Sequence, residues 1–138
     1  MTDPADHAGH GGRFLLLSGI QLERGQREIH CRVQVSRSGK SFHGEAREMD
    51  TPSGRMRAAA RAALAAAEQA VPGTSLGLEG ITIIQLFSRS YAVASVEAGR
   101  DRQFALLAGL ATIDATRALE DSAVLATLGA IDRWIATI

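Results

Sequence analysis

Cysteine is almost absent from this 138-residue chain, in which Cys31 is the only one. A single cysteine excludes an internal disulfide and is typical of proteins from a reducing compartment. Long apolar runs are also missing: no segment reaches the ~18 consecutive apolar residues of a membrane span, and the N-terminus has no apolar signal core. We therefore expect a cytoplasmic protein that has no membrane partner.

An excess of charge of either sign is lacking as well. Lys plus Arg and Asp plus Glu number 15 each, so the formal net charge is zero. Proteins that bind nucleic acid usually concentrate positive charge on one face, and no dense run of one sign occurs here. We expect no nucleic-acid partner. The remaining composition, 46% hydrophobic and 22% charged, is ordinary for one globular domain.

Several sequence signatures of catalysis are missing too. There is no His-Glu-x-x-His zinc helix, no complete Gly-x-x-x-x-Gly-Lys-Ser/Thr phosphate loop and no Cys-x-x-Cys pair. His30 and His43 fall on the polar side of predicted strands, and Cys31 belongs to an apolar series typical of an inert thiol. We predict no catalytic residue, no metal site and no cofactor. A catalytic base formed by His30 beside Arg47 stays an open alternative.

The first twelve residues are polar and rich in glycine. Their composition predicts a disordered tail over residues 1–12, followed by a single α+β domain over residues 13–138. His7 and His10 could bind a metal ion there, but two ligands on an unstructured segment do not form a closed site. We interpret both histidines as solvated.

A β-hairpin is predicted between residues 28 and 49, after a first strand over residues 14–24. Within the hairpin, residues 28–36 alternate between apolar and polar, and Ser38-Gly39 is typical of a tight turn. That turn pairs residues whose numbers sum to 77, so that Arg32 faces Glu45 on the polar side. The sheet should therefore be buried on one face and wetted on the other.

An alanine-rich helix follows this hairpin. Thr51-Pro52-Ser53 predicts its start and Pro72-Gly73 its end. Its apolar stripe is composed mostly of small residues: Met56, Ala60, Ala63, Leu64, Ala67 and Val71. A helix with so few large side chains can lie unusually close to a sheet, and Gly44 and Ala46 on the adjoining strand are small as well.

The same order of elements then recurs. Strands are predicted over residues 78–87, 91–97 and 103–113, and a second helix begins between Asp114 and Ser122. Gly44-Glu45-Ala46 corresponds to Gly109-Leu110-Ala111, and the alanine-rich helices also correspond. We predict an α+β fold formed by a tandem repeat of a βββα unit, with antiparallel sheets covered by two helices. The repeats span about residues 13–73 and 74–138.

This double order resembles the C-terminal regulatory and dimerisation domain of the 2-isopropylmalate synthase and homocitrate synthase family. Gly44-Glu45-Ala46 leading to Asp50-Thr51-Pro52, and Gly109-Leu110-Ala111 leading to Asp114, carry the resemblance. The second glycine of each family pattern is alanine here, and that family's catalytic barrel is absent. The resemblance implies a feedback ligand near the junctions of strand and helix. The implied ligand-binding residues are Gly44, Ala46, Asp50, Gly109, Ala111, Thr112 and Asp114.

Strands of the second repeat are apolar on both faces. The chain's own helices can cover one face, and the other face needs a partner unless the two sheets pack on each other. We expect a homodimer with Leu86, Val96 and Phe104 among its contacts. The function we expect is a non-enzymatic, dimerising regulatory module that binds a small metabolite or a partner protein. Open alternatives are a structural scaffold, a small enzyme and an RNA-binding domain.

Overall fold

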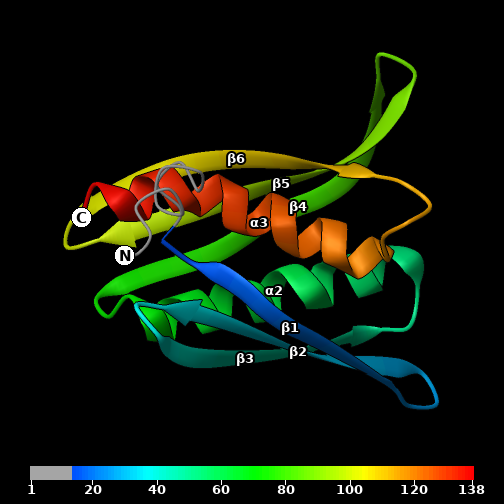
Figure 1. Ribbon diagram of the computed structural model, residues 1–138, viewed down its shortest axis with the longest axis horizontal. Helices are drawn as coiled ribbons and strands as arrows, with labels where there is room; N and C mark the ends of the chain where they lie inside the picture. Colours follow the sequence, from blue (N-terminus) through cyan, green and yellow to red (C-terminus); the bar gives the residue numbers. More distant parts are fainter. Residues whose placement is uncertain (1–13) are drawn as a thin grey trace.

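Two antiparallel three-stranded sheets and two helices follow one another along the chain (Figure 1). The structure is a computed structural model that describes residues 14–138, so the tail with His7 and His10 lies outside the described residues. Sheet A and its helix consist of β1 (Leu16–Arg24), β2 (Glu28–Arg37), β3 (Lys40–Met49) and α2 (Pro52–Ala70). Sheet B and its helix consist of β4 (Thr74–Leu86), β5 (Arg89–Arg100), β6 (Gln103–Ile113) and α3 (Leu119–Ala136). The predicted α+β fold is confirmed, and its order is consistent with a tandem βββα repeat.

The β2–β3 hairpin has the predicted register, with Arg32 opposite Glu45. Ser38 and Gly39 form the turn in left-handed conformations, with φ values of 53° and 80°. The carboxylate of Glu45 bonds a diagonal neighbour rather than Arg32: its Oε1 lies 2.6 Å from Nε2 of His30. His30 is thus one member of a polar network on the outside of sheet A.

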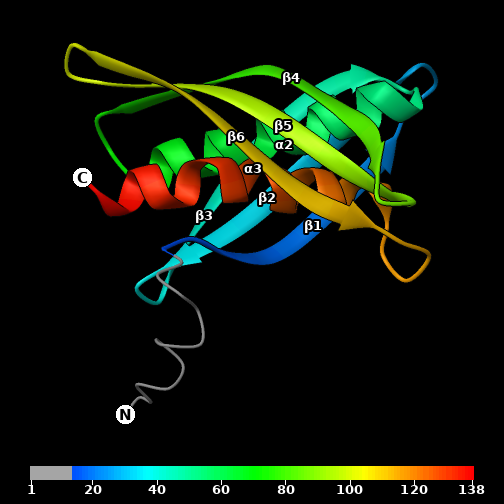
Figure 2. The same ribbon diagram turned by 90° about the horizontal axis from the view of Figure 1, so that it is seen from above.

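Both helices lie between the two sheets (Figures 1 and 2). Helix α2 contacts β2 and β3 of sheet A, β4 of sheet B, and helix α3. Helix α3 contacts β5 and β6. Alanines are therefore buried on several sides of α2 and not only along the predicted stripe. One consequence matters for function: each sheet has an outer face that points away from the helices.

A glycine at the same place in each repeat allows the helix to approach the strand closely. A Cβ atom at Gly44 would overlap the carbonyl oxygen of Ala62, and a Cβ atom at Gly109 would overlap that of Ala126. Only glycine fits these two positions without a shift of backbone. The equivalent contacts support the predicted correspondence between the repeats.

Strands β4 and β5 of sheet B are longer than predicted, whereas β6 has the predicted bounds. Strand β4 begins at Thr74, and the β4–β5 turn lies at Phe87-Ser88, where φ is 55° and 60°. Strand β5 continues to Arg100. The resulting β4–β5 hairpin rises away from the helices on the outer side of sheet B (Figure 1). Neither helix of the described part of the chain is long and apolar enough to cross a membrane.

Candidate functional site: the outer face of sheet B

Sheet B presents an apolar surface to solvent. Along β6, alternate side chains point away from the helices and stay uncovered: Phe104 is 86% exposed, Leu106 66% and Leu110 57%. Along β5 the outward series includes Tyr91 and Val93, which are half-buried within the sheet surface. We name this surface, on β4, β5 and β6, the outer face of sheet B.

Sheet A has the opposite character on its outer face. Its middle strand β2 presents His30, Arg32 and Gln34 outward, whereas Cys31 and Val33 point toward the helices and are buried. The ring Nε2–H of His43 on β3 donates a 3.0 Å hydrogen bond to Oε1 of Gln34. Hydrogen bonds and ion pairs join several side chains of this polar surface, so the unusual surface of the molecule is on sheet B.

The outer face of sheet B is built in rows across its strands. The middle row contains Thr82, Val93 and Leu110, which are paired directly by the β4–β5 and β5–β6 registers. Toward one end, Glu97 lies between Gly77 and Leu106, and toward the other end Arg89 pairs with Leu86. The face therefore has an apolar centre, an acidic end and a basic end.

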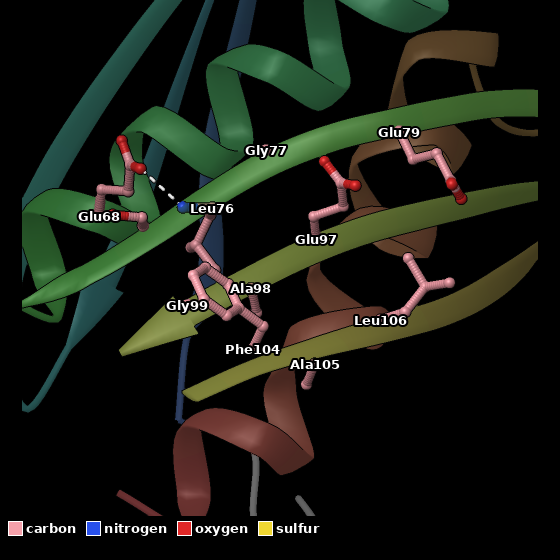
Figure 3. A pocket seen from close by; sticks show the side chains of 11 residues that line it. Glu68, Leu76, Gly77, Glu79, Glu97, Ala98, Gly99, Phe104, Ala105 and Leu106 are labelled. Atoms are coloured by element: carbon pink, nitrogen blue, oxygen red, sulfur yellow. Dashed lines mark hydrogen bonds between the residues drawn. The ribbon is translucent and has the colours of Figure 1, made fainter. Parts of the chain in front are cut away.

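An open groove with a volume of about 650 Å³ crosses the acidic end (Figure 3). Phe104 and Leu106 belong to its apolar lining, and Glu79 and Glu97 stand at its margin. Gly99 leaves room for the aromatic ring, because a Cβ there would come within 3.2 Å of Cε1 of Phe104. The groove suits a group that is both apolar and positively charged.

The two other carboxylate contacts near this groove are structural. Glu68 on α2 accepts a 2.8 Å hydrogen bond from the backbone N–H of Leu76, which fixes the start of β4 on the helix. The Ser95 hydroxyl donates a 2.5 Å hydrogen bond to Oε1 of Glu79. Glu97 has no ion-pair or hydrogen-bond partner for its side chain within residues 14–138.

The small residues of the predicted ligand site lie beneath the helices. Gly44 and Gly109 touch helix backbone, Ala46 is buried, and Ala111 is packed against the core. These four residues form the close helix–sheet contact, and the structure leaves no room for a ligand beside the two glycines. Their small size is thus explained by packing.

The polar residues of the predicted ligand site lie at the strand–helix junctions, which share one end of the molecule (Figures 1 and 2). Asp114 accepts hydrogen bonds from the backbone N–H and the hydroxyl of Thr116, at 2.9 and 2.5 Å, and these bonds hold its pKa below its usual range. Asp50 lies 3.8 Å from Nε of Arg55. The carbonyl of Thr112 accepts a 2.9 Å hydrogen bond from the Ser122 hydroxyl.

Two of the three predicted dimer contacts lie at the surface of sheet B. Leu86 and Phe104 are exposed at opposite ends of the outer face. Val96 requires a correction, because it is fully buried on the side that faces the helices. It contributes to the core and is omitted from the surface considered below.

The predicted dimer contacts did not include other residues of this surface: Arg89, Val93, Glu97, Leu106 and Leu110. A usable signal was present in the size of the alternating residues. On β5 the side next to the closely packed helix carries Ala92, Ala94 and Ala98, so the larger Tyr91 and Val93 mark the outer side.

No family model matches this chain, and no curated protein matches it. Within residues 14–138, no group of three or more His, Cys, Asp or Glu side chains is placed to hold a metal ion. The outer face of sheet B is the candidate site considered below.

Proposed function

We propose that this chain is a non-enzymatic, dimerising regulatory module that binds a small metabolite or a partner protein. The observation that supports it is the uncovered apolar face of sheet B, with Phe104, Leu106 and Leu110 more than half exposed. Contiguous apolar surface of this kind on a soluble chain usually marks an interaction site. Full burial of one such side chain is worth roughly 1.5–3 kcal/mol, so a few of them can drive association.

A second copy of the chain is the simplest cover for this face. The alternative closure, in which the chain packs its two sheets on each other, is prevented by the helices that separate them. In a two-fold dimer, one self-complementary interface covers the apolar face of both chains. Antiparallel sheets commonly pack face to face in this way.

The ligand-binding part of the proposal rests on the resemblance to the regulatory domain described above. Of the residues that the resemblance implies, Asp50, Thr112 and Asp114 keep polar atoms near the shared end of the molecule. A metabolite or a partner segment would bind at that end, away from the packed glycines. Dimerisation and ligand binding would then use different surfaces of the same module.

Light scattering coupled to size exclusion tests the dimer directly. At micromolar concentration the wild-type chain should elute with twice its 14.6 kDa mass. Leu110→Lys should give a monomer, because it places a charge at the centre of the apolar face. Gln21→Lys, at an exposed position on sheet A, is the matched control and should stay dimeric. A wild-type monomer at high concentration would contradict the proposal.

A thermal-shift screen against amino acids and common metabolites tests the regulatory part. A specific rise in melting temperature, lost in an Asp114→Ala variant, is the expected result because a ligand that binds the folded state stabilises it. A dimer whose melting temperature no metabolite changes, and which captures no partner, would favour a structural scaffold instead.

A further inference from the structure

Opposite charges stand at the two ends of the outer face of sheet B. Arg89 and Glu97 are both exposed on β5 and both point outward, with Val93 midway between them. Neither forms an ion pair with another residue of the described range 14–138. At the usual rise of a β-strand, each lies roughly 13 Å from Val93 along the strand.

Two-fold symmetry allows these charges to meet in only one arrangement. When equal faces of two sheets meet, the two-fold axis must lie between the sheets and parallel to them. An axis along the strands would place Arg89 on Arg89 and Glu97 on Glu97, which is unfavourable because like charges repel. An axis across the strands makes facing strands antiparallel and places Arg89 of each copy over Glu97 of the other.

We propose that two copies of this chain pair in this second way, with the axis across the strands at Val93 and with reciprocal Arg89–Glu97 ion pairs. The inference rests on the proposed dimer and adds its orientation. The axis then follows the row Thr82–Val93–Leu110, so that the apolar centre of one face covers the same residues of the other. Antiparallel, nearly aligned strands are a common mode of sheet-on-sheet packing.

The β4–β5 hairpin and the groove support this orientation. The hairpin rises on the outer side of sheet B, where a second copy would lie (Figure 1), and its end carries Leu86, the exposed Phe87 and Arg89. The groove at the other end offers apolar Phe104 and Leu106 beside carboxylates (Figure 3). The hairpin end therefore combines apolar side chains with a positive charge, which is the combination that this groove suits. The antiparallel orientation brings each hairpin end toward the groove of the other copy.

Charge reversal at the two ends provides the test. Arg89→Glu places four carboxylates in facing pairs, and Glu97→Arg places four guanidinium groups in facing pairs. Each variant alone should dimerise at least about tenfold more weakly than wild type. An equimolar mixture of the two should form a heterodimer of near wild-type affinity, because both of its facing pairs then have opposite sign. Analytical ultracentrifugation with one variant fluorescently labelled measures all three.

Control and contrary outcomes separate this inference from the proposed function. Arg32→Glu, an exposed charge reversal on the middle strand of sheet A, should dimerise like wild type. This orientation is wrong if both sheet B variants dimerise like wild type, or if their mixture associates as weakly as each variant alone. In either case the dimer itself still stands, and the groove binds another occupant. If wild type itself is monomeric, the dimer fails as well. Circular dichroism checks that each variant is folded, and Arg89→Gln with Glu97→Gln repeats the test without repulsion.

Discussion

The two buried strand glycines show how a missing side chain can determine the distance between helix and sheet. Gly44 and Gly109 each lie against the backbone of the helix that follows in sequence, at a residue that the repeat places equivalently. Glycine in a strand weakens it, since it loses more chain entropy on folding and packs no side chain. The closer helix–sheet contact at these two positions offsets that loss.

The first prediction concerns Gly109. Gly109→Ala should lower the free energy of unfolding by about 1–3 kcal/mol, because the new Cβ overlaps the carbonyl oxygen of Ala126 and forces α3 away from β6. Gly129 offers a matched control on α3, where no atom lies within 4 Å of a built Cβ. Gly129→Ala should raise stability by up to about 1 kcal/mol, as expected for an exposed helix position. Urea unfolding measures both, and equal effects of the two substitutions would refute the close-contact explanation.

Cys31 provides a second prediction at this scale. Burial, and to a smaller extent the carboxylate of Glu120, raises the pKa of its thiol to about 11 from 9.0. The thiolate of Cys31 is the form that attacks the disulfide of an exchange reagent, so the native protein at pH 8 should label far more slowly than the unfolded chain. Rapid native labelling would show that the β2–β3 side of the core opens readily.

The same shift has a defined sign for stability. The raised pKa stabilises the fold fully below pH 9, where the thiol is protonated in both states, and this contribution is lost as the pH rises from 9 toward 11. Wild type should therefore lose more stability than a Cys31→Ala variant over that window. Parallel pH profiles of the two proteins would contradict the assignment.

At the scale of single elements, α2 depends on a cap that the sequence predicts. The Thr51 hydroxyl oxygen accepts a 2.9 Å hydrogen bond from the backbone N–H of Gly54, and Pro52 opens the helix. Thr51→Ala should cost about 1 kcal/mol of stability, since one buried N–H at the helix start loses its acceptor. Ser53→Ala, on the exposed first turn, should cost much less. Thermal unfolding of the two variants compares them, and an equal loss would mean that the cap is unimportant.

Elements with an unambiguous period or turn could be predicted from sequence. The turn at Ser38-Gly39 and the alternation of β2 together determine the β2–β3 register, and the structure has that register. The sequence predicts the β4–β5 turn at residues 88–90, between strands 78–87 and 91–97, whereas it lies at Phe87-Ser88, because phenylalanine is not a residue that favours turns. The long β4 and β5 are also continuously β-forming, so their ends carry no strong signal.

The side of a strand that faces the core was harder to predict where both sides are apolar. Alternation identifies two faces of β5 but does not show which one is covered, and Val96 was placed on the wrong one. A strand residue that faces a closely packed helix must be small or must fit between alanines. Val96 alternates with Ala94 and Ala98, so it belongs to the side that faces the helix. Residue size, combined with alternation, is therefore the better guide in this fold.

At the scale of the whole molecule, the arrangement of layers was not predictable. Alanine is compatible with a contact on any side of a helix, so the composition of α2 does not show that it packs against sheet A, β4 and α3 at once. That arrangement leaves two outer faces of contrasting character, polar on sheet A and apolar on sheet B. Of the candidate site, the exposed Phe104 and Leu86 were predictable from the sequence. The opposite charges of Arg89 and Glu97 could be placed at the two ends of the face only once the strand registers of sheet B were known.

The last prediction follows from that contrast and concerns the stability of the whole assembly. If folding and pairing through sheet B are linked, dilution should lower the melting temperature, because association stabilises only the folded chain. The melting temperature of wild type should rise with protein concentration over a hundredfold range, and that of Leu110→Lys should not. Gln21→Lys on sheet A should behave like wild type. The concentration range should include the point at which light scattering shows the dimer dissociating. If the melting temperature of all three proteins is independent of concentration over that range, the outer face of sheet B contributes no stability by pairing.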